Sequence, residues 1–386
     1  MNIVFLSPGF PPNWKHFAIA LRQAGATVLG LGESSYDSLD PELVAHLNEY
    51  YYLPDMTNYD AMLRAMGHFT HRWGRIDHIE SLTEYWLGIE ARLREDFNVP
   101  GPKTKEMNEA RSKLGMKTRF KQAGCAVAPA ARIDNAQSLL AFVHEHGYPV
   151  IVKPDIGVGA LQTYRIDNEA ELAPFLAHPP NNGLVEKFID APLLSFDGLT
   201  DREGNILYVN GLIYSAGVRE FIAERRPVEY HTRREFPPAL EEAGRRIVAA
   251  FGLRERFFHI ELFKLADGRY LPLEINVRPP GGFTVDMWNY ACDFDIYKIW
   301  ADFVVNGLSD LSYKRKYFCA HVGRRTEHDY KLSHDELIRE LGPALAMHRP
   351  MPSVFAEAIG DYSYIIRHPE EAGLMEAVRL AVALKD

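Results

Sequence analysis

The chain of 386 residues has little of what marks a disulfide-bonded, membrane-spanning or nucleic-acid-binding protein. Its only cysteines, Cys125, Cys292 and Cys319, lie far apart without a CxxC pair, which argues against a disulfide framework or a cysteine zinc site. No segment approaches about 18 uninterrupted apolar residues, the length that would predict a membrane span. The net charge of −9 gives no bulk attraction for nucleic acid or anionic lipid. We therefore expect a cytoplasmic protein with no nucleic-acid and no membrane partner.

The composition is that of a folded globular protein, with 47% hydrophobic and 25% charged residues. At roughly 150 residues per domain, the length predicts two or three domains. Up to residue 100, short apolar runs (3–6, 27–31, 50–53 and 78–82) alternate with longer amphipathic stretches. This alternation predicts an α/β domain with a parallel sheet, and Gly101-Pro102 marks its end.

Two segments after Gly101-Pro102 carry lysines that could bind an anion. Residues 104–124 have a helical pattern, and Lys113, Lys117 and Lys121 are spaced by four, so they share one face. Lys153 ends an apolar strand directly before a turn with Gly157 and Gly159, whose backbone N–H groups can approach anionic oxygens. Each signal has a simpler interpretation, because lysines at strand ends and on helix stripes usually face water.

The most informative stretch is a predicted hairpin around Asp267-Gly268. If these two residues form the whole loop, Ala266 faces Arg269 and Glu261 lies directly opposite Glu274. His259 and Asn276 then share the side of the two glutamates, while Leu262, Leu273 and Ile275 point into the core.

Two like charges directly opposite each other destabilise a sheet, so we expect a cation between Glu261 and Glu274. Carboxylate and amide oxygens suit Mg²⁺, which commonly takes one or two carboxylates and completes its shell with water and phosphate. The alternative is a solvent-exposed edge of mixed charge, and Pro272 in the second strand fits an edge or a bulge.

In this order, the segments resemble the ATP-grasp superfamily, carboxylate–amine ligase type, whose two α+β lobes clamp ATP. The resemblance rests on Glu261, on Glu274-Ile275-Asn276-Val277-Arg278 and on Gly281-Gly282, and extends over residues 103–285. It implies a Rossmann-like N-terminal domain (1–102), an ATP-grasp domain (103–310, with lobes 103–185 and 186–310) and a C-terminal α+β subdomain (311–386).

The resemblance also implies the roles of individual residues. Glu261, Glu274 and Asn276 would bind Mg²⁺ (or Mn²⁺), and Arg278 would neutralise an acyl phosphate or carboxylate. Lys113 and Lys153 would hold phosphates under a glycine loop that contains Gly157 and Gly159. The adenine would lie at a hinge formed by Glu186, Lys187 and Ile189, and Asp190 would substitute for the glutamate that is often found at the ribose.

The implied activity is ATP-dependent ligation. A carboxylate becomes an acyl phosphate and is joined to an amine, with release of ADP and phosphate. The substrates would be a small carboxylic acid and an amine, including an amino acid, and a homodimer is left open. Two alternatives remain: a carboxylase that acts through carboxyphosphate, and an ATP-binding protein without catalysis.

Overall fold

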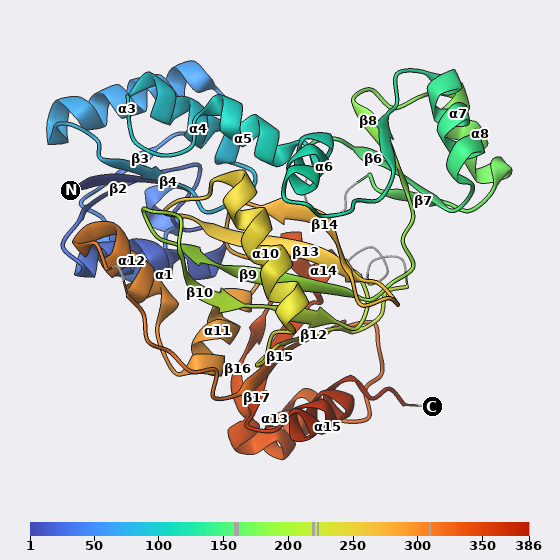
Figure 1. Cartoon of the computed structure of the whole chain (residues 1–386). Helices are drawn as coiled ribbons and strands as arrows, with labels where there is room; N and C mark the ends of the chain where they lie inside the picture. Colours follow the sequence, from blue (N-terminus) through green and yellow to red (C-terminus); the bar gives the residue numbers. More distant parts are fainter. Residues whose placement is uncertain (158–161, 218–220, 222–223, 309, 386) are drawn as a thin grey trace.

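The computed structural model describes residues 1–157, 162–217, 221, 224–308 and 310–385, which form three β-sheets and the helices around them (Figure 1). Among these residues no helix is both long enough and apolar enough to span a bilayer. Gly159, one of the two glycines predicted to cover phosphates, lies outside the described residues.

The N-terminal sheet is parallel, as predicted, with strand order β3-β2-β1-β4. Ile3 and Phe5 of β1 are buried on one face and Val4 and Leu6 on the other, as expected for a sheet covered by helices on both sides. The elements of this domain are β1 (Asn2–Leu6), η1 (Pro12–Trp14), α1 (Lys15–Gln23), β2 (Thr27–Gly32), η2 (Tyr36–Ser38), α2 (Pro41–His46), β3 (Glu49–Tyr52), α3 (Tyr59–Trp73), β4 (His78–Glu80) and α4 (Leu87–Asp96).

The segment predicted as one helix over 104–124 is two helices, α5 (Thr104–Arg111) and α6 (Lys113–Gln122). Ser112 between them has an extended backbone, and its side chain accepts a hydrogen bond from the N–H of Gly115, which caps α6. The predicted end is confirmed, because Gly124 has a φ of +72° directly after the last turn. The break separates the side chains of Arg111 and Lys113.

The first lobe is a small antiparallel sheet with strand order β5-β8-β6-β7, which projects away from the rest of the molecule (Figure 1). Two helices cover it and share its apolar core. Its elements are β5 (Ala130–Arg132), α7 (Ala136–His146), β6 (Val150–Pro154), β7 (Tyr164–Ile166), α8 (Glu169–Ala177) and β8 (Gly183–Lys187).

The large sheet is antiparallel throughout, in the order β14-β13-β9-β11-β12-β15-β17-β16, and β10 also pairs with β9. Its strands are β9 (Leu193–Thr200), β10 (Ile206–Asn210), β11 (Leu212–Tyr214), β12 (Val228–Thr232), β13 (Phe257–Lys264), β14 (Tyr270–Asn276), β15 (Phe318–Arg324), β16 (Leu345–Pro350) and β17 (Tyr362–His368). The helices here are α10 (Pro238–Phe251), α11 (Thr284–Cys292), α12 (Ile296–Asn306), α13 (His334–Leu341), α14 (Ser353–Ile359) and α15 (Glu371–Val382), with η3 (Gly342–Ala344). Strands of residues 311–386 thus continue the large sheet, and the domain boundaries stay predictions.

A shared core joins the N-terminal domain to the large sheet. Phe17 of α1 contacts Phe257 of β13 and both Tyr297 and Trp300 of α12 edge to face, all within one apolar cluster. This contact gives the two parts a continuous hydrophobic interface.

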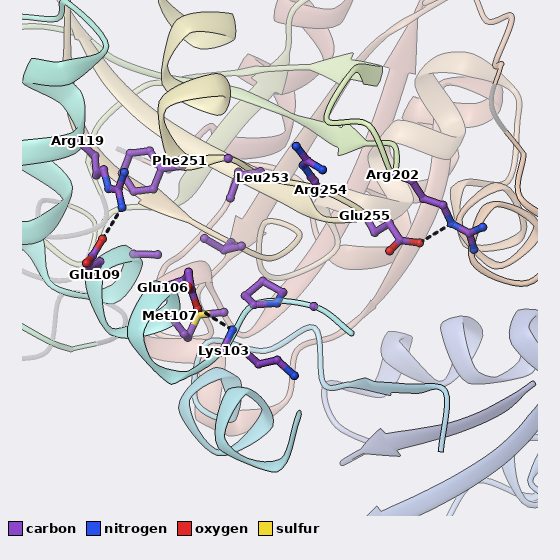
Figure 2. Close-up of a pocket in the computed structure, with 15 residues that line it drawn as sticks. Lys103, Glu106, Met107, Glu109, Arg119, Arg202, Phe251, Leu253, Arg254 and Glu255 are labelled. Carbon is purple, nitrogen blue, oxygen red and sulfur yellow. Dashed lines mark hydrogen bonds and ion pairs between the residues drawn. The ribbon is translucent and has the colours of Figure 1, made fainter. Parts of the chain in front are cut away.

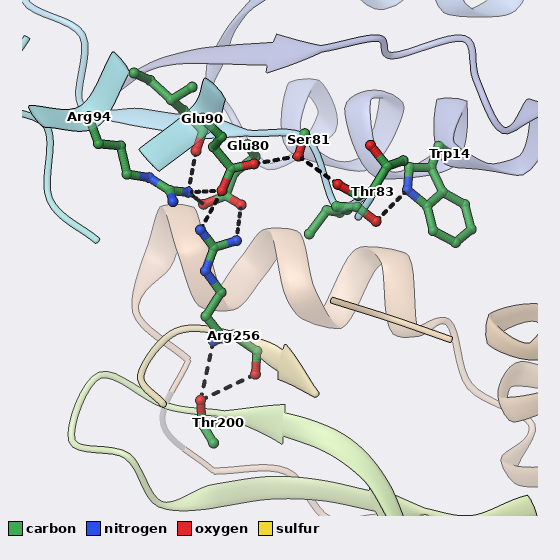
Figure 3. Close-up of polar contacts among 10 residues, drawn as sticks. Trp14, Glu80, Ser81, Thr83, Glu90, Arg94, Thr200 and Arg256 are labelled. Atoms are coloured by element: carbon green, nitrogen blue, oxygen red, sulfur yellow. Dashed lines mark hydrogen bonds and ion pairs between the residues drawn. The ribbon is translucent and has the colours of Figure 1, made fainter. Parts of the chain in front are cut away.

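Four buried charges lie beside this core (Figure 3). Arg256, directly before β13, binds Glu80 at 2.9 Å and Glu90 at 2.5 Å, and Arg94 binds the same glutamates at 3.2 and 2.6 Å. Their side chains are between 0% and 8% exposed, and the two arginines balance the two glutamates. This four-charge network, Glu80, Glu90, Arg94 and Arg256, fixes β4 and α4 against the large sheet.

Candidate active site

The β13–β14 hairpin has the predicted acidic pair, although its loop differs from the prediction. Glu261 lies directly opposite Glu274, and His259 lies opposite Asn276. The loop is longer than two residues, because the N–H of Leu265 bonds to the carbonyl of Arg269; the predicted pairing of Ala266 with Arg269 is therefore wrong. Gly268 has a φ of +84°, as the last residue of a three-residue hairpin loop requires.

A β-bulge compensates for the extra loop residue. Glu261 pairs with Glu274, but Leu262 pairs with Pro272, so Leu273 is the additional residue on β14. Leu262 and Ile275 are fully buried as predicted, whereas Leu273 is only partly buried, because the bulge turns it out of the alternation. Pro272 lies on the edge strand of the sheet and beside a bulge, which are both of the settings predicted for it.

The side of the hairpin that carries the two glutamates also carries oriented polar groups. Asn276 donates from Nδ2 to Glu274 Oε1 at 3.3 Å, and Arg278 donates from Nη2 to Asn276 Oδ1 at 3.3 Å. The described residues contain no group of three or more His, Cys, Asp and Glu side chains that could hold a metal. Two carboxylates and one amide are nevertheless the donors that Mg²⁺ takes when phosphates complete its shell, so the donor set fits this ion.

His259 holds one of these glutamates. Its Nδ1 is 2.7 Å from Asp197 of the neighbouring strand β9, and its Nε2 is 3.4 Å from Glu261 Oε1. Burial lowers the pKa of His259, but Asp197 and Glu261 outweigh burial and raise this pKa to about 9. An imidazole that is protonated near neutral pH is a hydrogen-bond donor to Glu261 and cannot itself ligate a metal.

The buried lysines of the first lobe surround Glu186. Lys153 Nζ is 2.5 Å from Glu186 Oε2, and Lys117 of α6 binds the other carboxylate oxygen. Burial favours the neutral forms, but the mutual attraction raises the pKa of Lys153 and lowers that of Glu186. The charges of Glu274 and Glu261 also raise the pKa of Lys153.

Lys117 is a site residue that the sequence reasoning did not select. It belongs to the lysine stripe at spacing four, but it is 5% exposed because α6 packs this side chain against the first lobe. Lys117 and Lys153 thus each bind one oxygen of Glu186, and its role at an adenine stays a prediction.

Lys113 begins α6 beside the glycine turn. Its Nζ is 3.5 Å from the carbonyl of Gly157, and Asp155 ties the two segments by accepting from Ser112 Oγ at 2.7 Å and from the N–H of Leu114 at 3.0 Å. Burial lowers the pKa of Lys113, and the charge of Glu274 opposes this shift. The two predicted phosphate lysines thus both lie within the electric field of the β14 carboxylate.

The predicted adenine hinge spans the end of β8. The N–H of Lys187 bonds to the carbonyl of Pro129 at 2.9 Å, its Nζ binds the carbonyl of Tyr148 at 2.9 Å, and the N–H of Phe188 bonds to Pro149 at 3.2 Å. No backbone carbonyl of the described residues accepts from the N–H of Ile189. Within the predicted hinge, the N–H of Ile189 is therefore available to an adenine. Asp190 is exposed.

Arg278 reaches from the hairpin toward the N-terminal domain. It donates from Nη1 to the carbonyl of Pro279 at 2.8 Å, and its Nε is 3.7 Å from Glu84 Oε2. Glu84 follows β4, and it also accepts from Arg111 Nε at 3.2 Å. Sequence reasoning missed both Glu84 and Arg111, although the carboxyl ends of parallel strands are the usual place for ligand-binding residues.

A separate cavity of about 380 Å³ lies on the other side of β14 (Figure 2). Its walls include Met107 of α5, Leu253 after α10, and Val277, which points away from the side shared by Asn276 and Arg278. Because none of the predicted nucleotide or metal residues lines it, we do not place the reaction there.

Comparison with known proteins finds a family match for the central part of the chain. Residues 112–278, which contain every predicted site residue, match the family model for the ATP-binding domain of the carbamoyl-phosphate synthase L chain. The chain is 25% identical over 276 residues to an L-arginine-specific L-amino acid ligase from Bacillus subtilis, and this match covers 66% of each protein.

Solved structures show the same fold over nearly the whole chain. An L-amino acid ligase from Bacillus licheniformis has a TM-score of 0.75 at 17% identity and covers 98% of this chain and 96% of its own. An N5-carboxyaminoimidazole synthetase from Staphylococcus aureus, complexed with ADP, has a TM-score of 0.72 at 16% identity. The match covers 97% of this chain and 95% of the synthetase. The expected fold is confirmed.

Proposed function

We propose that this chain, which has the ATP-grasp fold and the ATP-binding domain of that superfamily, joins a carboxylic acid to an amine at the expense of ATP. The observation that carries the proposal is the pair Glu261 and Glu274, held directly opposite each other, whose charges raise the pKa of Lys153 in the other lobe. Such a pair is electrostatically costly unless a cation neutralises it, and MgATP provides this cation together with phosphates for the lysines.

The first step is phosphoryl transfer. A carboxylate oxygen of the acid attacks the γ-phosphorus, the bond from this phosphorus to the β–γ bridging oxygen breaks, and ADP leaves. Lys113 and Lys153 hold phosphate oxygens, and Ile189 presents its N–H to the base. Glu261, Glu274 and Asn276 would hold Mg²⁺, which would supply charge neutralisation for the phosphates.

The second step forms the amide. The amine nitrogen attacks the carbonyl carbon of the acyl phosphate, the carbon–oxygen bond to phosphate breaks, and the proton lost by the amine leaves with the phosphate. Arg278 stabilises the negative charge of the acyl phosphate, so the residues act by positioning and electrostatics, without a nucleophilic side chain.

An amino acid is the substrate class that the relatives favour, because the related Bacillus subtilis protein is named as an L-arginine-specific L-amino acid ligase. We therefore test ADP release with MgATP and pairs of L-amino acids, starting with L-arginine, and with bicarbonate as a separate arm. Release that requires both an acid and an amine, with the amide found by mass spectrometry, supports the proposal. Release with bicarbonate and an amine alone would instead assign a carboxylase.

Two variants test the site. Glu261→Gln and Glu274→Gln preserve size and remove one charge each, and each is expected to lower turnover by about a hundredfold or more. Glu203→Gln, in the loop between β9 and β10, is the matched control and should turn over like the wild type. Full turnover in either hairpin variant would refute the metal assignment.

A further inference from the structure

Three side chains meet where the N-terminal domain faces the β13–β14 hairpin: Glu84, Arg111 and Arg278. Glu84 Oε1 accepts from Arg111 Nε at 3.2 Å, and Glu84 Oε2 is 3.7 Å from Arg278 Nε. Their side chains are 11%, 19% and 16% exposed, so solvent reaches all three. Two guanidinium groups against one carboxylate give the cluster a net charge of +1.

Only part of the Arg111 guanidinium donates hydrogen bonds to the described residues. Its Nε points to Glu84, and no acceptor among the described residues binds its two terminal nitrogens. A guanidinium presents these groups as a planar fork that matches the two oxygens of a carboxylate. Arg111 is the last residue of α5, directly before the break at Ser112.

The chain leaves room for this guanidinium. A Cβ at Gly88, the second residue of α4, would lie 2.6 Å from Arg111 Nη1, so any larger residue at position 88 would displace the group. The glycine is helical and has an ordinary negative φ, so its backbone does not require glycine. A side chain at position 88 would therefore force the Arg111 guanidinium to move.

We propose that Arg111 and Arg278 together bind the carboxylate of an amino-acid substrate, and that Glu84 is a positioning residue that holds both guanidinium groups by their Nε atoms. The proposal deepens the function proposed above and rests on it for the identity of the substrate. A purely structural ion pair is the alternative. Such a pair would have no effect on substrate binding.

Gly88→Ala tests this arrangement without removing a charge. The added methyl group must displace the Arg111 guanidinium, and alanine favours the helix, so the variant should fold at least as stably as the wild type. Gly67→Ala is the matched control, because Gly67 lies in α3 and nothing lies within 4 Å of its would-be Cβ. Arg111→Lys keeps the charge but loses the fork, and Glu84→Gln loses the positioning carboxylate.

Binding is measured by calorimetry with a panel of the L-amino acids, L-arginine first, in the presence of Mg²⁺ and the non-hydrolysable analogue β,γ-imido-ATP. We expect Gly88→Ala, Arg111→Lys and Glu84→Gln to weaken amino-acid binding about tenfold or more, the usual effect of losing a charge-assisted hydrogen bond. Affinity for the nucleotide should change less than about twofold in each variant, and Gly67→Ala should match the wild type.

The outcomes separate this proposal from the ligase assignment. Amino-acid binding without ADP release would refute the ligase function and leave the subsite in place. Wild-type affinity in Gly88→Ala and Arg111→Lys, or no binding of any amino acid by the wild-type protein, would overturn the subsite. Equal losses of amino-acid and nucleotide affinity would also overturn it, because they would indicate a general structural defect.

Discussion

The four-charge network predicts a large loss of stability when Arg256 is replaced. Arg256→Met keeps most of the side-chain volume but leaves Glu80 and Glu90 with Arg94 alone, all at less than 9% exposure. Removing one partner from a buried ion pair costs about 3–5 kcal/mol, because a charge remains buried without compensation. This loss is a large fraction of the roughly 5–15 kcal/mol that stabilises a typical protein.

The loss is measured by urea unfolding. Because chains with several domains can unfold in steps, far-UV ellipticity and tryptophan fluorescence are recorded together. Trp14 reports on this interface, since its indole N–H bonds to the carbonyl of Leu82 at 3.0 Å. The control is Arg269→Met, whose pair with Asp267 is 67% and 51% exposed and should contribute at most about 1 kcal/mol.

The network also has a pH dependence with a defined sign. Burial raises the pKa of Glu90, but Arg94 and Arg256 outweigh it and lower this pKa below its usual 4.5. The stabilisation is therefore complete above about pH 4.5 and lost as the pH falls through the lower, folded-state value. Arg256→Met should be less sensitive to acid in this range. A stability loss below about 1 kcal/mol at pH 7, equal to that of Arg269→Met, would refute our view of the network.

Two further predictions concern buried charges elsewhere. Lys117→Met should lower ATP affinity about tenfold, because Glu186 then binds Lys153 alone and holds it away from phosphate. The affinity is measured by nucleotide titration, with Lys121→Met, which replaces an exposed lysine one turn later, as the control. Equal affinities of the two variants would contradict the prediction. Burial raises the pKa of Asp286 from 3.8 to about 6, despite a hydrogen bond from Asn13. The free energy of unfolding should therefore fall as the pH rises from about 4 to 6, by at most roughly 3 kcal/mol, because solvent that reaches the side chain reduces the effect. Asp286→Asn should flatten this part of the stability–pH curve, and an unchanged slope would show that another group titrates.

Local patterns predicted the parts of the site that depend on neighbouring residues. The Asp-Gly turn and the alternation of two short strands were enough to place Glu261 opposite Glu274. The loop length was wrong and the bulge at Leu273 was not expected, because both depend on how the edge strand twists against the sheet. The two errors cancelled at the acidic pair.

Contacts between distant segments could not be predicted in the same way. Lys117 belongs to a stripe that would face water on an isolated helix, and only the docking of α6 on the first lobe buries it beside Glu186. Glu84 and Arg111 are 27 residues apart, and their contact requires α5 to pack beside α4. No periodicity in the sequence contains this information.

The shared core of the N-terminal domain and the large sheet has a consequence for the order in which substrates add. Glu84 belongs to the N-terminal domain, and Arg278 follows the β13–β14 hairpin of the large sheet. The aromatic contacts of Phe17 and the four buried charges hold the N-terminal domain and the large sheet in one arrangement. Lys153 and Glu186 belong instead to the projecting lobe. A movement of this lobe would carry Lys153 and Glu186 and leave Glu84 and Arg278 in place. The acid should therefore be able to associate before or after ATP, and initial-rate kinetics would show random rather than compulsory addition.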